Sequence, residues 1–146
     1  MIREAQLEDC EAIWQLVCTL EETELDHAAF ATVFTEQQTD GRHVTLVWSE
    51  DADTGADAPI QALMNMRIEV QLHHAAKIAE VQELVVDPSL RGRGAGKELL
   101  TTACKAAREA GCVRIELVTN QRRHGAHRFY EHEGMHQTHY GYTLDL

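Results

Sequence analysis

The 146-residue chain has no long apolar run, and no stretch of it approaches the roughly 20 consecutive apolar residues of a membrane-spanning helix. Its first residues, "MIREAQLEDCEAIW", lack the basic block followed by an apolar block that is typical of a secretory signal. We therefore expect a cytoplasmic protein with no membrane partner. The length predicts one domain, residues 1–146, because it is enough for one core and too short for two ordinary domains.

Cysteine is sparse and shows no pairing pattern. The chain has no CxxC pair and no zinc-finger spacing among its four cysteines, Cys10, Cys18, Cys104 and Cys112. This spacing argues against a disulfide framework or a metal site built from cysteine. We expect the four side chains to be small buried hydrophobic groups.

Basic residues are too few for a general nucleic-acid-binding protein. The formal net charge is −11, whereas binding to nucleic acid depends on a basic surface. We therefore expect no nucleic-acid partner, and the negative total suits a small cationic substrate better. The nine histidines are numerous for the length and several lie close together, which makes them candidates for a site.

The hydrophobic pattern predicts an α/β protein with a mixed sheet and helices packed on it. We expect strands at residues 2–6, 44–49, 60–74, 77–86, 113–119 and 136–146, the last as a strand or hairpin. We expect helices at residues 7–22, around 30–34, at 96–110 and at 123–133. The acidic segment 50–59 is predicted to be a turn between two antiparallel strands.

The segment "LVVDPSLRGRGAGKELL", residues 84–100, places a glycine-rich turn between a predicted strand and a predicted helix. Such a turn gathers backbone N–H groups at the positive end of the helix dipole, which favours a phosphorylated ligand. Two common phosphate-binding motifs do not fit. A Walker A loop needs Gly at position 91, which is Arg91, and Ser or Thr after Lys97; a dinucleotide fingerprint needs GxGxxG, and Gly92, Gly94 and Gly96 form GxGxG.

The same segment resembles the acetyl-CoA loop of the GCN5-related N-acetyltransferases, in which a strand and a Pro precede R/Q-x-x-G-x-G/A and a helix. Arg91, Gly94 and Gly96 match this pattern. The resemblance implies that the loop binds the pyrophosphate of coenzyme A and that the strand before it binds the pantetheine arm. The residues implied in cofactor binding are Leu84, Val85, Val86, Arg91, Gly92, Arg93, Gly94, Ala95, Gly96 and Lys97.

A second motif agrees with the first. In the same family the next strand is followed by an Asn and then by a helix with A-x-x-F/L-Y-x-x-x-G-F, and this chain has the residues in that order: Asn120, Ala126, Phe129, Tyr130, Gly134 and Met135. Met135 replaces the usual aromatic residue at a packing position. Together the motifs cover residues 78–136 and imply the family's fold, a mixed sheet of about six to seven strands flanked by about four helices. They add Asn120 and Tyr130 to the expected cofactor site.

A narrower resemblance, to the aminoalkylphosphonate N-acetyltransferases, reaches almost the full length. It depends on "LDHAAF", "LHH", "VQELVV", "RRHGAHRFY" and "HYGYTLDL". It implies that acetyl-CoA is the cosubstrate, that the acceptor is the primary amine of an aminoalkylphosphonate, and that a divalent cation assists. A phosphonate dianion needs cationic groups, and "RRHGAHR" supplies five candidates, although a solvated basic helix start is an equal alternative for Arg122 and Arg123.

Transfer from a protonated amine to a thioester requires a base and an acid. Members of the family place a glutamate six residues before the last apolar position of the strand, and counting back from Val86 gives Glu80. Glu83 is the nearest alternative, and either could be an ordinary solvent-facing residue. Tyr130 matches the family's tyrosine that protonates the departing thiolate, unless it only packs beside Phe129. We expect the thioester carbonyl to be polarised by the backbone N–H of Val85 or Val86.

Histidines and one aspartate are the remaining candidates. Substrate-binding residues implied by the resemblance are Asp26, His27, His74, Arg123, His124 and His127. His73, His74, His124 and His127 could ligate a cation, and His124 and His127 could share a helix face, but a lone imidazole is more often structural. The metal ligands stay open at this point.

Three functions remain open. The first is a small-molecule N-acetyltransferase acting by direct transfer in a ternary complex. The second keeps the fold but has a polyamine, an amino acid or a protein amine as acceptor. The third is an acetyl-CoA-binding sensor without turnover, against which Glu80 and Tyr130 argue. Dimers are usual in the family, but no surface patch in the sequence establishes a homodimer, so the oligomeric state stays open at this point.

Overall fold

The computed structural model describes residues 1–50 and 59–146 and divides into two compact units, residues 1–116 and 117–146. Each unit is described by itself. Most of the turn predicted at residues 50–59 lies outside the described residues. Among the helices of the described ranges, none is both long enough and apolar enough to cross a membrane.

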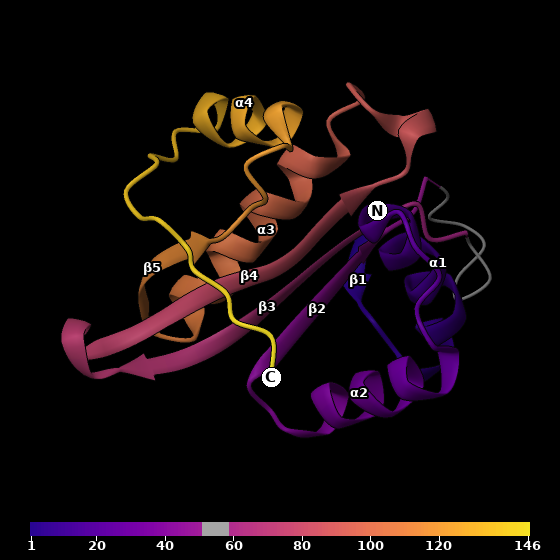
Figure 1. Cartoon of the computed structure of the whole chain (residues 1–146), viewed down its shortest axis with the longest axis horizontal. Coiled ribbons are helices and arrows are strands. Elements are labelled where there is room, and N and C mark those ends of the chain that lie inside the picture. Colours follow the sequence, from indigo (N-terminus) through magenta and orange to yellow (C-terminus); the bar gives the residue numbers. More distant parts are fainter. Residues whose placement is uncertain (51–58) are drawn as a thin grey trace. The chain divides into compact units, whose positions relative to one another are not determined.

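The first unit is formed around a five-stranded mixed sheet in the order β1-β2-β3-β4-β5 (Figure 1). Its strands are β1 (Ile2–Glu4), β2 (His43–Trp48), β3 (Ala62–Gln71), β4 (Ala76–Val86) and β5 (Cys112–Leu117). Strands β1 to β4 pair antiparallel with their neighbours, which confirms the antiparallel pair expected on either side of segment 50–59.

Three helices belong to the first unit and one to the second. They are α1 (Cys10–Glu21), α2 (His27–Thr39), α3 (Ala95–Glu109) and α4 (His124–His132). Short 3-10 turns precede α1, join β3 to β4 and follow β4: η1 (Leu7–Asp9), η3 (Leu72–His74) and η4 (Pro88–Leu90). Helix α2 is longer than the weak pattern around residues 30–34 indicated, because Asp26 caps its first turn by accepting a hydrogen bond from the Ala29 amide at 2.7 Å.

Helices cover both faces of the sheet, as the alternation of the strands requires. Val47, Leu63 and Val85 join side chains of α1 and α2 in one buried cluster. Trp48 follows Val47 and points to the other face, where its indole N–H donates to Glu98 of α3 at 2.8 Å. The first face, under α1 and α2, carries the candidate site.

Two expectations need correction. The structure has five strands in the described residues instead of six to seven, because residues 136–146 form no strand. The four cysteines are free, as expected, but each is only partly buried, since they lie at the margins of the core.

Candidate active site

The glycine-rich segment after β4 forms a turn that ends at the first residue of α3. Gly92 and Gly94 have φ values of 79° and 91°, in the left-handed region that favours glycine, and Gly94 is the N-cap of α3. Gly96 lies inside the first helical turn. Asp87 organises the start of the segment, because its carboxylate accepts a hydrogen bond from the Ser89 amide at 2.8 Å.

This turn has the donors that a phosphate group needs. The first amides of an α-helix have no intrahelical acceptor, and Gly94 has no side chain to cap them. A Cβ added at Gly92 or Gly94 would meet nothing within 4 Å, so the backbone is open to a ligand. Exposed cationic side chains flank it at Arg91 and Lys97, and Arg93 forms an ion pair with Glu50. These features fit the pyrophosphate of coenzyme A.

The strand residues before the turn alternate between the two faces of the sheet. Val85 is buried in the cluster under α1 and α2, and Leu84 and Val86 are half-buried. They pair with Leu63, Met64 and Ala62 of β3. Their predicted contact with the pantetheine arm stays a prediction.

A β-bulge decides where the two candidate glutamates of β4 point. Asn65 of β3 pairs with Glu83, and the next residue, Met66, pairs with Val81, so β4 carries one extra residue at Gln82. Glu80 and Glu83 lie an odd number of positions apart and would face opposite sides of a regular strand. Because of the bulge, both lie on the face covered by α1 and α2.

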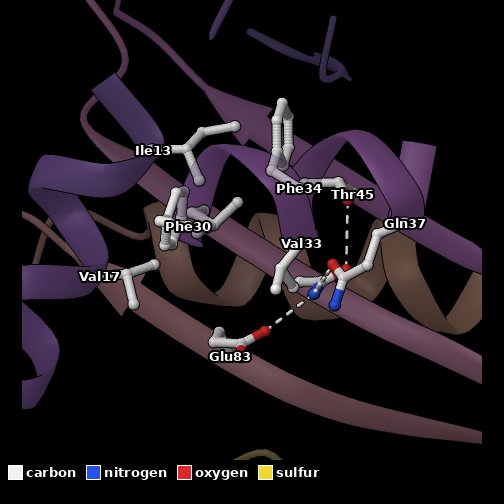
Figure 2. Close-up of a pocket in the computed structure, with 10 residues that line it drawn as sticks. Ile13, Val17, Phe30, Val33, Phe34, Gln37, Thr45 and Glu83 are labelled. Atoms are coloured by element: carbon white, nitrogen blue, oxygen red, sulfur yellow. Dashed lines mark hydrogen bonds between the residues drawn. The ribbon is translucent and has the colours of Figure 1, made fainter. Parts of the chain in front are cut away.

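Glu83 lines a small cavity of about 70 Å³ between the sheet and helices α1 and α2. Figure 2 shows Ile13, Val17 and Phe30 on one side of the cavity, Gln37 and Thr45 on the other, and the Glu83 carboxylate below them. The walls are mainly apolar, and Glu83 is the one ionisable side chain among the described residues that line them.

The Glu83 carboxylate has an environment that favours taking up a proton. Burial raises the pKa of Glu83, and the negative charge of Glu21 adds to the rise; the hydrogen bond from Asn65 and the charge of His43 lower it by less. Asn65 Nδ2 donates to Glu83 Oε2 at 2.8 Å. A carboxylate in such a cavity is suited to act as a general base.

Glu80 has a different environment. Its side chain is 30% exposed, and its Oε2 lies 3.8 Å from Nη2 of Arg67, the residue opposite it on β3. Arg67 also contacts Glu69. Glu80 therefore has a cationic partner and lies outside the set of described residues that line the cavity.

The polar side chains that hold Glu83 were not predicted from the sequence. Asn65 is buried in the apolar strand β3, and its Nδ2 also donates to Gln37 Oε1 of α2 at 3.0 Å. The available signal was a lone Asn in "ALMNM", since a buried amide in an apolar strand requires partners.

Asp26 and His27 lie where α2 begins, and their observed contacts are structural. Asp26 caps α2, as described above. His27 Nε2 lies 2.8 Å from Glu11 Oε2, and its ring packs edge-on against Trp14 with centroids 5.0 Å apart. Their role in substrate binding stays a prediction.

His73 and His74 lie in η3, at the connection between β3 and β4. His74 contacts Gln71 Oε1 through Nδ1 at 2.7 Å and Arg114 through Nε2 at 2.9 Å. In residues 1–50 and 59–146, no three His, Cys, Asp or Glu side chains are grouped closely enough to hold a metal ion. We therefore assign no metal ligands and derive no step through a metal ion.

The second unit contains the other predicted residues, on α4 and the turn before it. Asn120 shapes this turn, because its Oδ1 accepts from the Arg122 amide and its carbonyl lies 3.0 Å from His127 Nε2. The His124 and His127 rings lie 5.8 Å apart, which confirms that these residues share a face of α4.

Tyr130 lies on α4 beside Phe129, with ring centroids 5.4 Å apart. Burial raises the pKa of the Tyr130 phenol, and the charge of Arg123 opposes the rise. The phenol is therefore protonated at neutral pH, as an acid must be before it donates.

The comparisons with known proteins agree with the geometry. The model of the acetyltransferase (GNAT) family matches residues 7–135. The chain is 38% identical to an aminoalkylphosphonate N-acetyltransferase of Salmonella typhimurium over 146 residues, which cover 99% of this chain and 90% of the relative.

Two solved structures show the same fold. A transcriptional regulator from Bacillus halodurans superposes with a TM-score of 0.88 at 23% identity, covering 100% of this chain and 99% of the other. Glucosamine-6-phosphate N-acetyltransferase from Arabidopsis thaliana superposes with a TM-score of 0.80 at 22% identity, covering 99% and 97%.

The glycine turn at the start of α3 leaves the first amides of the helix without a side-chain cap, and the family model extends over most of the chain. The chain belongs to the acetyltransferase (GNAT) family and is an acetyl-CoA-dependent N-acetyltransferase.

Proposed function

We propose that this enzyme transfers the acetyl group of acetyl-CoA to the primary amine of a small aminoalkylphosphonate. The observation that carries this proposal is the 38% identity, over 99% of the chain, to a protein with that activity in its name. The cavity beside Glu83 supports it, because an apolar wall suits a short alkyl segment and a carboxylate suits the attached amine.

The base is proposed to be one of the two carboxylates of β4. Glu80 is the residue that the family spacing predicts, and Glu83 is the alternative that the contacts support better. Glu83 lines the cavity and has a raised pKa, whereas Glu80 is paired with Arg67. We therefore assign the proton-accepting role to Glu83 and keep Glu80 as the competing assignment.

The reaction needs no covalent enzyme intermediate. Glu83 takes a proton from the ammonium, and the neutral nitrogen attacks the thioester carbonyl while the backbone N–H of Val85 or Val86 stabilises the developing oxyanion. The C–S bond breaks as the tetrahedral intermediate collapses. Tyr130 donates its proton to the departing thiolate, and the extra proton on the attacking nitrogen passes to the resulting phenolate, which gives the neutral amide, free coenzyme A and the restored phenol.

The phosphonate dianion requires cationic partners. We propose Arg123, His124 and His127 of the second unit for this role, with Asp26, His27 and His74 as further substrate contacts. A divalent cation is a second source of positive charge, and its ligands are not assigned.

A polyamine is the second candidate acceptor. It is favoured by the net charge of −11 and by the absence of Arg and Lys among the described residues that line the cavity. Amino acids and protein amines are weaker members of the same class. A sensor without turnover is the remaining alternative.

Release of free thiol from acetyl-CoA tests these proposals together. The acceptors are 2-aminoethylphosphonate, 3-aminopropanol as an amine without the anion, and spermidine, each assayed with and without EDTA. We expect 2-aminoethylphosphonate to have the highest kcat/KM, and a loss with EDTA would establish the cation. Consumption of spermidine with 2-aminoethylphosphonate ignored would overturn the acceptor assignment. Binding of acetyl-CoA without thiol release from any amine would indicate a sensor.

A further inference from the structure

Asn65 is a buried polar residue whose side chain connects three elements. It is 6% exposed, on β3, between the β2 residue Thr45 and the β4 residue Glu83 in the register of the sheet. Its carboxamide contacts both of these residues and also Gln37 of α2. A buried amide with this many partners has one fixed orientation.

The direction of each hydrogen bond in this network follows from the chemistry of its members. Gln38 Nε2 donates to Thr45 Oγ1 at 3.2 Å, so the Thr45 hydroxyl donates onward to Asn65 Oδ1, also at 3.2 Å. Both N–H bonds of Asn65 are then directed away from Thr45, one to Gln37 Oε1 and one to Glu83 Oε2. Glu83 Oε2 is therefore already an acceptor in this network, which leaves Oε1 as the oxygen with more free acceptor capacity.

We propose that Asn65 is a positioning residue for catalysis, which holds Oε2 of Glu83 as an acceptor and leaves Oε1 as the atom that takes the proton from the substrate amine. This inference rests on the base role proposed for Glu83. In the step, an N–H bond of the ammonium breaks and an O–H bond forms at Oε1. The ammonium and the carboxylate both become neutral, so no other reactant is needed.

The charged groups near Glu83 come from each element packed against it. The negative charge of Glu21 of α1 raises the pKa of Glu83, and His43 of β2 lowers it when its ring is protonated. His43 Nδ1 itself lies 2.8 Å from Asp40 at the end of α2. On the same face of the sheet, Arg67 and Glu80 form the neighbouring pair. Asn65 is the neutral donor that contacts the carboxylate directly.

The pH dependence of kcat/KM for the best acceptor tests this role, because a residue that is only structural would not move it. In Asn65→Asp, a second carboxylate replaces the donor beside Glu83, and two adjacent carboxylates resist losing both protons. The acid limb of this profile is the fall in kcat/KM at low pH, where the base is protonated. We expect it to move to higher pH by more than about one unit in Asn65→Asp, with activity recovering at alkaline pH. Since the substrate is the same in both enzymes, its own amine cannot cause the difference.

Thr45→Val is the matched control, a substitution of equal burial on the neighbouring strand that keeps the Asn65 bond to Glu83. We expect its acid limb to move less than that of Asn65→Asp. Should Asn65→Asp fail to fold, Asn65→Ser, whose shorter side chain places its hydroxyl out of reach of Glu83 without adding charge, is expected to move the limb upward by about one unit. Thermal unfolding of each variant identifies the folded ones.

The outcomes separate this inference from the proposed function. An inactive Glu83→Gln together with an unmoved acid limb in Asn65→Asp, or in Asn65→Ser where Asn65→Asp does not fold, would overturn the positioning role alone. A fully active Glu83→Gln would overturn the base role first. A parallel shift in Thr45→Val would show that the limb responds to general loosening of the strand, which would also overturn the positioning role.

Discussion

Glu80 and Glu83 lie on the same strand and the same face of the sheet, yet their surroundings differ in a way that matters for catalysis. Glu83 lies beside an apolar cavity, and its direct partner is a neutral amide. Glu80 is 30% exposed and its partner is a guanidinium. Glu83 thus combines burial, a neutral partner and a raised pKa, whereas Glu80 is an ion-pair partner outside the residues that line the cavity.

The comparison shows that spacing along a strand is a weak guide to a catalytic carboxylate when the strand contains a bulge. The extra residue at Gln82 brings both glutamates to one face, so either could reach a ligand there. Their partners on β3, Asn65 and Arg67, then distinguish them. Paired substitutions can test this distinction.

The largest effect is expected from substituting the two glutamates separately. Glu83→Gln should lower kcat by about 10²- to 10⁴-fold, because the amide cannot accept the proton, whereas Glu80→Gln should lower it by less than about tenfold. Steady-state kinetics at saturating acetyl-CoA measure both. The reverse ranking would restore Glu80 as the base, and equal losses would mean that the two carboxylates act as a pair.

A smaller effect on kinetics is expected from a substitution in the glycine turn before α3. This substitution separates changes in acetyl-CoA binding from the changes in proton transfer that distinguish Glu83 from Glu80. Gly94→Ala places a Cβ at a φ of 91° in the turn, and we expect KM for acetyl-CoA to rise by about tenfold, with a stability loss of about 1 kcal/mol. Its pH profile should stay in place. Gly111→Ala is the matched control, since Gly111 has a φ of 84° at the other end of α3.

Gly111→Ala should show a similar loss of stability with KM for acetyl-CoA unchanged. If both variants raise KM equally, the effect comes from distortion of α3, and the turn loses its assigned role as the pyrophosphate site. If Gly94→Ala shifts the acid limb of the pH profile of kcat/KM, then cofactor binding also contributes to that profile. In that case the kinetic difference between Glu83→Gln and Glu80→Gln does not report proton transfer alone.

The smallest effect is expected on stability. Because the pKa of Glu83 is raised in the folded protein, the fold binds this proton more readily than the unfolded chain does. The buried charge therefore destabilises the fold above the folded-state pKa. This cost disappears as pH falls through that pKa toward the ordinary glutamate value.

Denaturant unfolding of the wild type and of Glu83→Gln between pH 5 and 8 measures this destabilisation by the buried Glu83 charge. We expect Glu83→Gln to be more stable at pH 8, by up to about 1 kcal/mol, and the difference to shrink toward pH 5. Glu80→Gln should show no such gain, since it loses its pair with Arg67. A Glu83→Gln variant that is less stable at pH 8 would contradict the assigned environment of Glu83.

The local parts of the fold were predictable because short-range patterns determine them. The glycine-rich segment predicted a turn between a strand and a helix, and the structure has this turn, with positive φ at Gly92 and Gly94. The stripe of Leu99, Leu100 and Ala103 predicted α3, whose core face they form. The prediction of a strand or hairpin at residues 136–146 was wrong, because a strand-like sequence does not by itself provide a partner strand.

The order of the residues by itself determined the family and the glycine turn before α3, because a glycine pattern beside a strand and a helix specifies its own backbone shape. Only the tertiary structure decided which carboxylate is suited to be the base. That choice depends on the bulge at Gln82 and on the pairing of Glu83 with Asn65 and of Glu80 with Arg67, and these contacts join strands whose register the local sequence does not encode.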